Sequence, residues 1–384
     1  MTGQGRPRIV IIGAGATGRG QIGQLADAAG FAITFIERDR ALVQCLSSSG
    51  RYTVILAGET AREIEIRGFE VFHVDEVEAC AQAVGEADIV ATAVLPSNLE
   101  STVPTLAEGL ALRRERQVAR PLNIIACENM ERSSSTLREC LRRGAPDLDW
   151  AWVNEHVGFP DAMVARAVPA PNDPLVLPAE AEQEWSVDAR AIKEPLPRLA
   201  GMTLSENQEA ALERKLYIKN TGHFAIGILG WLKGYRLMHE AARDPEIFAQ
   251  VDAATRESAA AVATKHGFPA QAIEEYRAAF LEQLKSPFLP DEVERVIREP
   301  MRKLGREERL VGPAMLACAS GEAPHALARV IAAAFRVANP RDPESLQLQS
   351  GVRSEGLEAV LESVCGIPES HPLMGPIVKA YHGG

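Results

Sequence analysis

The stretch Ile9–Gly20 reads IVIIGAGATGRG and decides how the first half of the chain folds. It joins an apolar run to Gly13, Gly15 and Gly18, which form a GxGxxG pattern ahead of a helical segment. The first glycine permits a tight turn, the second lets the backbone approach a pyrophosphate, and the third lets helix and strand pack closely. Free N–H groups at the helix N-terminus favour phosphate oxygens. The stretch therefore predicts a dinucleotide-binding turn; a glycine-rich turn in an unrelated α/β protein is the alternative.

The sequence around this stretch alternates strands with helical segments. Runs rich in β-branched residues, which are typical of buried parallel strands, lie at Arg8–Ile12, Ala32–Ile36, Ile89–Val94 and Asn123–Cys127. Helical spacing follows the first two of them, at Arg19–Ala28 and Asp39–Leu46. This alternation predicts an α/β Rossmann domain with a doubly wound parallel sheet.

The chain changes character twice. After residue 150, prolines interrupt the helical pattern, and we expect two short strands at Glu184–Val187 and Ala191–Lys193. A pair of prolines, Pro195 and Pro197, closes this part, and helical spacing dominates from there on. We therefore predict a Rossmann domain over residues 1–200 and an all-α substrate and catalytic domain over residues 201–384.

The end of the second predicted strand indicates which dinucleotide the turn prefers. Glu37 stands about 20 residues after Gly18, where an acidic side chain accepts hydrogen bonds from ribose hydroxyls and repels a 2′-phosphate. This favours NAD over NADP, although the neighbouring Arg38 could serve a phosphate. The residues that we assign to the cofactor are Gly13, Ala14, Gly15, Ala16, Thr17, Gly18, Glu37, Arg38, Ala93, Val94 and Asn129.

The second half carries its chemical candidates in KLYIKNTGH, residues 215–223. On an α-helix Asn220 and His223 share a face, and Lys215 lies about 80° from His223 around the axis. Oxidation of an alcohol by hydride transfer needs a base for the hydroxyl proton and donors for the growing alkoxide. A buried lysine can be that base, an amide can hold the alkoxide, and the histidine can position the substrate oxygen. Surface or capping roles are the alternative, but the helix-interior Gly222 favours close approach by another group.

A second polar cluster, Glu128–Arg132, follows the predicted strand Asn123–Cys127. Ligands of open α/β sheets bind beyond the carboxyl ends of the strands, so Asn129 is expected at the nicotinamide crevice. Its amide would be a second donor to the alkoxide. An asparagine that only forms a turn or caps a helix is the alternative.

Four pieces of the sequence together resemble the long-chain polyol dehydrogenase family, and within it the mannitol-1-phosphate 5-dehydrogenases. They are GAGATGRG (13–20), NIIACENM (123–130), HVGFPDAMVARAVP (156–169) and KLYIKNTGH with LGWLKGY (215–223 and 229–235). The resemblance implies Lys215 as the base, Asn129 and Asn220 as the pair that stabilises the alkoxide, and His223 as a substrate contact. It also implies catalysis without a metal by a Rossmann domain joined to a helical domain.

The function that the resemblance implies is an NAD-dependent oxidoreductase that interconverts an acyclic polyol phosphate, like mannitol 1-phosphate, with a ketose phosphate, like fructose 6-phosphate. Gln21, Ala165 and Ser286 depart from the family pattern and leave the substrate open. A dehydrogenase of a free hexitol or pentitol, such as mannitol, altritol or arabinitol, is therefore an alternative. More distant alternatives are a 3-hydroxyacid or 6-phosphogluconate type of dehydrogenase and a dinucleotide-binding regulatory protein without turnover.

The basic segment Glu294–Arg309 bears on whether the substrate is phosphorylated. Arg295 and Arg302 lie on it at helical spacing, and guanidinium groups there could bind a phosphate. An exposed face neutralised by neighbouring glutamates is the alternative. The residues that we assign to the substrate are Arg19, Asn220, His223, Arg295 and Arg302.

Composition argues against several other classes of protein. The 384 residues are 46% apolar and 24% charged, as in globular domains, and the formal net charge of -11 disfavours nucleic acid and anionic membranes as partners. Apolar runs fall short of the roughly 20 residues of a membrane span, and the short polar N-terminus does not read as a signal peptide. Scattered cysteines and histidines predict reduced thiols, no metal and a cytoplasmic protein. We expect a monomer or small homo-oligomer that binds small molecules.

Overall fold

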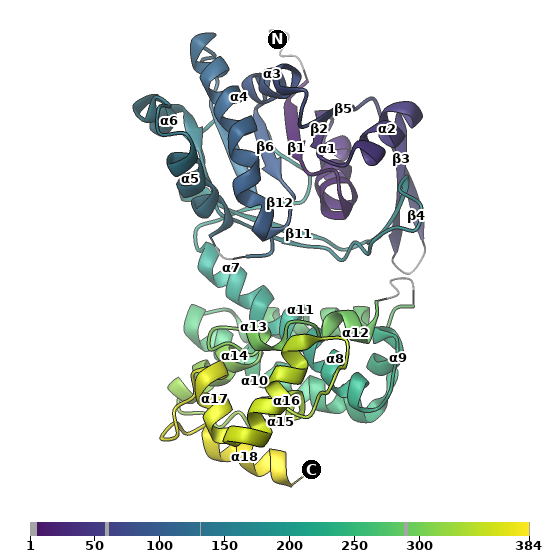
Figure 1. Ribbon diagram of the computed structural model, residues 1–384, viewed down its shortest axis with the longest axis vertical. Helices are drawn as coiled ribbons and strands as arrows, with labels where there is room; N and C mark the ends of the chain where they lie inside the picture. Colours follow the sequence, from purple (N-terminus) through teal and green to yellow (C-terminus); the bar gives the residue numbers. More distant parts are fainter. Residues whose placement is uncertain (1–5, 58–60, 131, 288–290, 384) are drawn as a thin grey trace. The chain divides into compact units, whose positions relative to one another are not determined.

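The computed structural model describes residues 6–57, 61–130, 132–287 and 291–383. The chain divides into two compact units, Met1–Ala211 and Leu212–Gly384. The first is built around a parallel sheet and the second from helices, as the ribbon in Figure 1 shows for each unit. The sequence places the domain boundary earlier, near residue 200, and that boundary stays a prediction.

The first unit holds a six-stranded parallel sheet in the order β5-β2-β1-β6-β7-β8. Its strands are β1 (Arg8–Ile12), β2 (Ala32–Glu37), β5 (Glu70–His73), β6 (Ile89–Thr92), β7 (Leu122–Ala126) and β8 (Val157–Gly158). This order is that of a doubly wound dinucleotide-binding sheet. The predicted fold class is confirmed, and the four strands expected from apolar runs are β1, β2, β6 and β7.

Both faces of this sheet are buried, which explains the uninterrupted apolar runs. In β1, Ile9 and Ile11 enter one apolar cluster while Val10 and Ile12 enter another, because side chains alternate across a strand. The helices of this unit are η1 (Gly18–Gly23, a π-turn), α1 (Gln24–Ala28), α2 (Arg40–Ser49), α3 (Val77–Glu86), η2 (Pro96–Thr102, 3-10), α4 (Val103–Glu115), α5 (Ser133–Gly144) and α6 (Trp150–His156).

Two three-stranded sheets complete the unit. One is β10-β3-β4 and the other β12-β11-β9. Their strands are β3 (Arg51–Ala57), β4 (Arg62–Arg67), β9 (Ala162–Ala165), β10 (Val176–Glu180), β11 (Glu184–Asp188) and β12 (Met202–Ser205). The predicted strand Glu184–Val187 is confirmed as β11, whereas the sequence analysis did not predict the other five.

The predicted strand Ala191–Lys193 is wrong. Ala191 ends a short 3-10 turn, η3 (Ala189–Ala191), and not a strand. Beyond the turn, the amide side chain of Asn123 bonds the backbone of Lys193 in both directions, accepting from its N–H at 2.9 Å and donating to its carbonyl at 2.8 Å. A buried side chain thus satisfies backbone groups that a strand neighbour would otherwise take.

The second unit is helical, which confirms the all-α prediction. After α7 (Gln208–Arg214) its helices are η4 (Lys215–Asn220, a π-turn), α8 (Thr221–Leu232), α9 (Met238–Arg243), α10 (Pro245–His266), α11 (Ala270–Gln283), α12 (Val293–Val296), α13 (Pro300–Lys303), α14 (Val311–Ala319), α15 (His325–Ala334), α16 (Pro343–Glu355), α17 (Leu357–Cys365) and α18 (Met374–His382). Across the described ranges, none of the helices is both long and apolar enough to span a membrane.

The long helix α10 organises the helical unit and contacts α8, α9, α11, α14 and α15. Its bounds follow from local chemistry. The Asp244 carboxylate accepts from the N–H groups of Glu246 and Ile247 at 2.9 and 3.1 Å, and Pro245 occupies the first helical position. Gly267 ends the helix in the left-handed conformation, which costs glycine little.

Candidate active site

The glycine turn follows β1 at the carboxyl edge of the parallel sheet, where open α/β sheets bind ligands. Gly13 has a φ of +102°, and a Cβ there would lie 2.5 Å from the carbonyl oxygen of Ala93. A Cβ on Gly18 would lie 1.9 Å from the carbonyl oxygen of Gly13. A Cβ on Gly15 would meet nothing within 4 Å, so the backbone there is open to a ligand. The three glycines fit the tasks that a pyrophosphate-binding turn requires.

Glu37 ends β2 and holds the turn through its carboxylate. Its Oε2 accepts from the N–H of Ala14 at 2.7 Å, and its Oε1 accepts from the N–H groups of Arg38 and Asp39 at 2.8 and 2.9 Å. Each carboxylate oxygen has two lone pairs, so Oε2, which accepts one hydrogen bond, can still accept from a ribose hydroxyl. The side chain therefore has a structural role beside the cofactor role predicted for it. Arg38 is exposed.

Arg19, which we assigned to the substrate, is buried in the first unit. Its Nε donates to the carbonyl of Ala14 at 2.5 Å, its guanidinium donates to the carbonyl of Pro174, and it lies 5.7 Å from the ring centroid of Tyr52. These contacts hold the glycine turn against the segment before β10. They give Arg19 a structural role and do not support a substrate role.

The ends of β6 and β7 are joined by Glu128, which the sequence analysis did not select. Its buried carboxylate accepts from the Thr92 hydroxyl at 2.8 Å and from the N–H of Val94 at 3.0 Å. Burial raises the pKa of this carboxyl, and the two hydrogen bonds oppose that rise. Asn129 follows directly and is exposed, and Ala93 and Val94 are half-buried. An acidic residue at the end of a buried strand was the available signal for Glu128.

Lys215 and Asn220 lie on the π-turn η4, and not on an α-helix as the sequence analysis assumed. In an α-helix, residues five apart are about 140° apart around the axis. In a π-turn each N–H bonds the carbonyl five residues back, so residues five apart lie on nearly the same face. Because α8 starts at Thr221, His223 follows Asn220 by three residues of α-helix. The π-turn therefore brings Lys215, Asn220 and His223 closer to one face than the predicted 80° implied.

This face is the accessible side of its helix. Lys215, Asn220 and His223 are half-buried, whereas Tyr217 and Ile218 between them are buried. π-turns inside helices are rare and occur often at functional sites. The arrangement supports a shared chemical role for the three polar side chains.

Gly222 is explained by packing within the helical unit. A Cβ there would lie 3.0 Å from the Phe280 ring and 3.2 Å from the Thr255 methyl group. The expected close approach is thus confirmed, and the approaching groups are side chains of α11 and α10. They pack against the side of α8 that faces away from solvent, where Thr221 and Gly222 are buried.

Asp291 joins two predicted substrate residues, His223 and Arg295. Its Oδ2 lies 3.2 Å from Nε2 of His223, and its Oδ1 accepts from Nε of Arg295 at 2.5 Å, while Nη2 of Arg295 donates to Oδ2. Burial alone would raise the pKa of this carboxyl, but hydrogen bonds from His223 and Arg295 hold it well below its usual range. Asp291 was not predicted from the sequence, although an acid four residues before an arginine was a usable signal.

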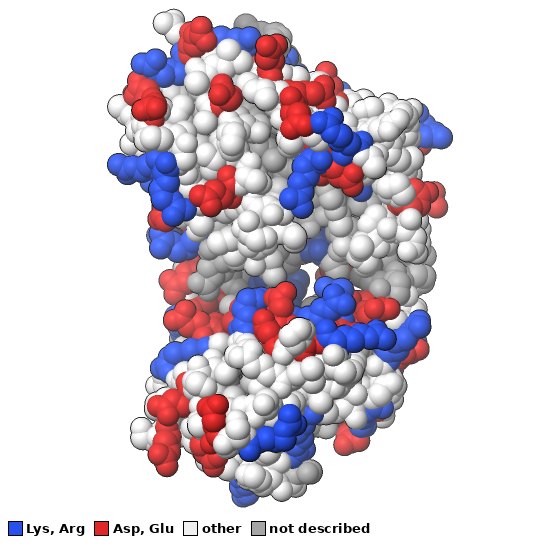
Figure 2. Space-filling view, viewed as in Figure 1, with Lys and Arg blue, Asp and Glu red and all other residues white. Residues whose placement is uncertain are grey.

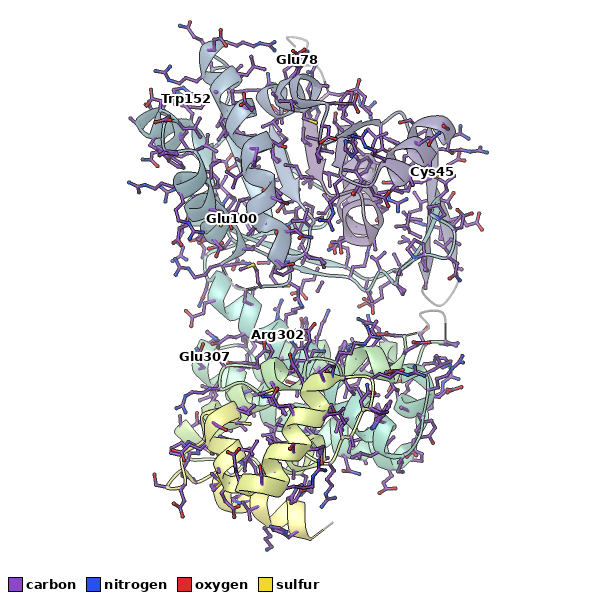
Figure 3. The ribbon with its side chains drawn as sticks, in the orientation of Figure 1. Cys45, Glu78, Glu100, Trp152, Arg302 and Glu307 are labelled. Atoms are coloured by element: carbon purple, nitrogen blue, oxygen red, sulfur yellow. The ribbon has the colours of Figure 1, made fainter. Side chains whose placement is uncertain are left out.

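Arg302 lies on an exposed face neutralised by glutamates, which was the alternative given for the basic segment. Its side chain is 53% exposed, and its guanidinium pairs with Glu299 at 2.7 Å and with Glu308 at 3.3 Å. Figure 3 shows Arg302 on the surface of the helical unit, and Figure 2 shows basic and acidic side chains interspersed on this unit's visible surface. The charge of Arg302 is therefore already compensated, which does not support a substrate role.

The next residue, Lys303, is a buried cation that the sequence analysis did not assign. Its ammonium donates to the carbonyl of Val296 at 2.9 Å and lies 5.6 Å from the ring centroid of Phe224. The guanidinium of Arg309 lies 5.9 Å from the centroid of the same ring. Across the described part of the chain, no carboxylate forms an ion pair with Lys303. Burial lowers the pKa of Lys303 to about 8, and the charges of Arg309 and Arg302 add to the effect.

The buried Lys303 predicts that the free energy of unfolding rises with pH above about pH 8. In the unfolded chain a lysine keeps its proton up to about pH 10.4. Between pH 8 and that value the unfolded state binds more protons than the folded state, so the free energy of unfolding rises with pH. Below pH 8 the buried charge costs the folded state at most about 3 kcal/mol. Lys303→Met is expected to be more stable than wild type at pH 7, with the difference shrinking toward pH 10 in urea unfolding.

The control is Lys233→Met. Hydrogen bonds with Glu246 and Asp244 raise the pKa of Lys233, so the stability they give is lost only above about pH 10.4 and the difference from wild type is expected to stay nearly constant between pH 7 and 10. A Lys303→Met difference that does not change between pH 7 and 10 would contradict the account.

Cysteines and metal ligands add no further centre to the described residues. All six cysteines are free thiols, four of them buried. Across the described ranges, no three His, Cys, Asp or Glu side chains gather in a way that could hold a metal ion. A glycine turn on a doubly wound parallel sheet, followed by a helical unit, is typical of a dinucleotide-dependent dehydrogenase.

Comparison with known families identifies the kind of dehydrogenase. The model of the mannitol dehydrogenase Rossmann domain matches residues 7–201, and that of the mannitol dehydrogenase C-terminal domain matches residues 209–382. The chain belongs to the mannitol dehydrogenase family. It is an NAD-dependent polyol dehydrogenase, which confirms the predicted family, enzyme class and cofactor.

Solved structures show the same fold. A Pseudomonas fluorescens mannitol 2-dehydrogenase in ternary complex with NAD and D-mannitol is 19% identical, with a TM-score of 0.76 over 98% of this chain and 92% of that one. A substrate-free D-sorbitol dehydrogenase is 15% identical, with a TM-score of 0.80 over 98% and 93%. A D-mandelate dehydrogenase is 14% identical, with a TM-score of 0.51 over 89% and 99%.

Proposed function

We propose that the protein interconverts an acyclic polyol phosphate, like mannitol 1-phosphate, with a ketose phosphate, like fructose 6-phosphate, with Lys215 as general base. The observation that carries the proposal is the π-turn η4, because it brings Lys215 to the face of the helix that bears Asn220 and His223. A base, an amide donor and a positioning imidazole on one face are the groups that oxidation of a secondary alcohol needs.

The residues of this chain divide the reaction between them. Lys215 takes the hydroxyl proton on Nζ, and the amide of Asn220 donates to the oxygen as negative charge develops there. Asn129, at the carboxyl edge of the sheet, keeps its predicted role as a second amide donor. His223 and Arg295 orient the remaining hydroxyls or the phosphate. The glycine turn and Glu37 would hold NAD, which would supply the acceptor for the hydride.

A phosphate needs cations whose charge is not already used. Lys303 offers one, since its ammonium bonds a backbone carbonyl and no carboxylate ion pair of Lys303 occurs in the described part of the helical unit. Arg295 adds hydrogen-bond donors although its charge is paired, because its ion pair with Asp291 uses Nε and Nη2 and leaves the N–H groups of Nη1. A buried lysine that costs stability is also easier to explain if it serves a ligand. These two cations support the phosphorylated substrate.

A free polyol is the second candidate. The Pseudomonas fluorescens structure holds D-mannitol, and the other polyol dehydrogenase of the same fold acts on D-sorbitol by its name. The compensation of Arg302 by Glu299 and Glu308 also favours an uncharged substrate.

A substrate panel separates the candidates. NADH formation is measured with mannitol 1-phosphate and with free mannitol, altritol and arabinitol. We expect kcat/KM for the phosphate to exceed that for any free polyol by about 100-fold or more, because two charge-assisted contacts are lost without it. The reverse order would favour the free polyol. NAD binding without NADH formation on any compound would favour the regulatory alternative, and activity only on hydroxyacids would favour the 3-hydroxyacid type.

Glu37 predicts the cofactor preference. Glu37→Ser is expected to lower kcat/KM for NAD by about 10-fold or more, because the ribose loses a charged acceptor and the N–H of Ala14 loses its partner. The ratio of NADP to NAD activity is expected to rise, since the carboxylate that repels a 2′-phosphate is gone. Steady-state kinetics with both cofactors measures this. Glu70→Ser, at the exposed first position of β5, is the control. An unchanged cofactor ratio in Glu37→Ser would contradict the assignment.

A further inference from the structure

We propose that Asp291 is a positioning residue that fixes the tautomer of His223, so that His223 presents Nδ1 to the substrate, and that aims Arg295 at the same substrate. The inference rests on the proposed function, in which His223 and Arg295 contact substrate. It goes further in assigning which nitrogen of the imidazole does so and which residue decides it.

The tautomer follows from the hydrogen-bonding capacity of a carboxylate. An ionised carboxylate only accepts, and it would repel a ring lone pair, so the 3.2 Å distance between Oδ2 of Asp291 and Nε2 of His223 favours the hydrogen on Nε2. In a neutral imidazole the other nitrogen then carries a lone pair and no hydrogen. Among the described residues, Nδ1 of His223 has no hydrogen-bond partner. The ring thus offers an acceptor, and not a donor, on its other side.

The backbone fixes Asp291 in place. Its carbonyl accepts from the N–H of Met238 at 2.9 Å, and the N–H of Val293 donates to the carbonyl of Arg236 at 3.0 Å. Leu237 and Glu292 form an antiparallel bridge between these two bonds. These backbone contacts therefore join the segment that carries Asp291 to the loop that follows α8. His223 lies near the start of α8. The backbone at Asp291 is therefore held in place, and the hydrogen bonds from Arg295 restrain the carboxylate itself.

The carboxylate of Asp291 is also partly shielded from solvent, which strengthens its contact with His223. Its side chain is 18% exposed, and that of His223 is 31% exposed. Partial burial strengthens a charge-assisted hydrogen bond relative to an exposed one. Because Arg295 engages the same carboxylate through Nε and Nη2, its guanidinium plane is fixed and Nη1 points away from the pair. One carboxylate therefore orients a hydrogen-bond acceptor and a cation together.

The chemical consequence concerns substrate selection. An unprotonated Nδ1 accepts from a hydroxyl but cannot donate to a carbonyl oxygen. His223 would then recognise a hydroxyl next to the reacting carbon, and it would not compete with Asn220 for the oxygen that becomes the ketone. A polyol bears a hydroxyl there in both oxidation states of the substrate. The pair of Asp291 and His223 therefore suits a substrate with hydroxyls on neighbouring carbons.

The first experiment reads the tautomer directly. Protein labelled with ¹⁵N-histidine is examined by long-range ¹H–¹⁵N NMR at a pH where His223 is neutral, and the spectrum of His223→Gln assigns its signal among the eight histidines. We expect hydrogen on Nε2 and none on Nδ1 in wild type. In Asp291→Asn, where an uncharged amide replaces the carboxylate, we expect that preference to weaken. A wild-type ring with its hydrogen on Nδ1, or an unchanged signal in Asp291→Asn, would overturn the proposal.

The matched control is Asp244→Asn. Asp244 is also a carboxylate of the helical unit with several donors, namely Lys233 and Tyr235, and asparagine preserves its helix cap. We expect its His223 signal to match wild type; a shift as large as that of Asp291→Asn would count against the proposal. If Asp291→Asn fails to fold by circular dichroism, the wild-type tautomer decides alone.

Kinetics supplies the second readout. Asp291→Asn is expected to raise KM for the polyol substrate about 10-fold or more while changing kcat and KM for NAD less than 3-fold, because substrate orientation is lost and the base is untouched. A fall in kcat at unchanged KM would contradict a positioning role. The NMR result does not depend on turnover, so it stands even if the polyol phosphate assignment fails.

Discussion

Lys215→Ala is expected to lower kcat by about a thousandfold or more, which is the size of a general-base contribution. The variant removes the amine that the π-turn η4 brings toward the face of Asn220 and His223. Without an amine at this position, water must take the hydroxyl proton. NAD affinity is expected to change little, because the residues assigned to the cofactor lie in the first unit. Stopped-flow NADH formation and titration of NAD by protein fluorescence measure the two quantities.

The neighbouring Lys219 is the matched control for Lys215. It lies on the same π-turn, and its ammonium sits 4.9 Å from the ring centroid of Tyr276. Lys219→Ala is expected to keep kcat within about threefold of wild type, since a cation–π contact of this kind contributes only about 1 kcal/mol to stability. Added primary amines are expected to restore part of the Lys215→Ala activity. Turnover of Lys215→Ala within tenfold of wild type would remove Lys215 as the base.

Gly18→Ala is expected to have the largest effect on stability. The new Cβ would lie 1.9 Å from the carbonyl oxygen of Gly13, and both atoms belong to a turn fixed between β1 and η1. Backbone must move, and the cost is expected to be several kcal/mol, as for other overpacked interiors. NAD binding is expected to be lost with the turn. Thermal unfolding and NAD titration measure the two effects.

Two glycine variants separate the causes of such a loss. Gly15→Ala adds a Cβ that meets no protein atom within 4 Å, so it is expected to fold like wild type and to weaken NAD binding alone. Gly375→Ala, which also meets nothing and lies in α18, is expected to affect neither. Gly18→Ala with wild-type stability, or Gly15→Ala with full NAD affinity, would contradict the roles assigned to the two glycines.

The sequence by itself was enough for the four central strands of the parallel sheet, β1, β2, β6 and β7, and for the class of enzyme. Strands buried on both faces carry uninterrupted apolar runs, and the chemistry of the glycine turn needs only its own few residues. Both signals are local and can be read without the tertiary structure. Strands that lack these signals were missed: β4, with REIEIR, is short and mostly exposed, so it has no apolar run.

Only the tertiary structure decided how the side chains of the site are used. A shift from i→i+4 to i→i+5 hydrogen bonds turns Lys215 toward the face of Asn220, and no residue pattern in KLYIKNTGH announces that shift. Arg19 and Arg302 looked like substrate residues until their partners, a distant carbonyl and nearby glutamates, were visible.

The link from His223 to Asp291 is the clearest case. The two residues are far apart in the chain and meet because a backbone bridge closes the loop after α8 onto the segment before α12. A sequence lists which groups can donate and accept. Which donor meets which acceptor depends on the packing of distant segments, and that packing sets the tautomer, the compensated charges and the cations left for a substrate.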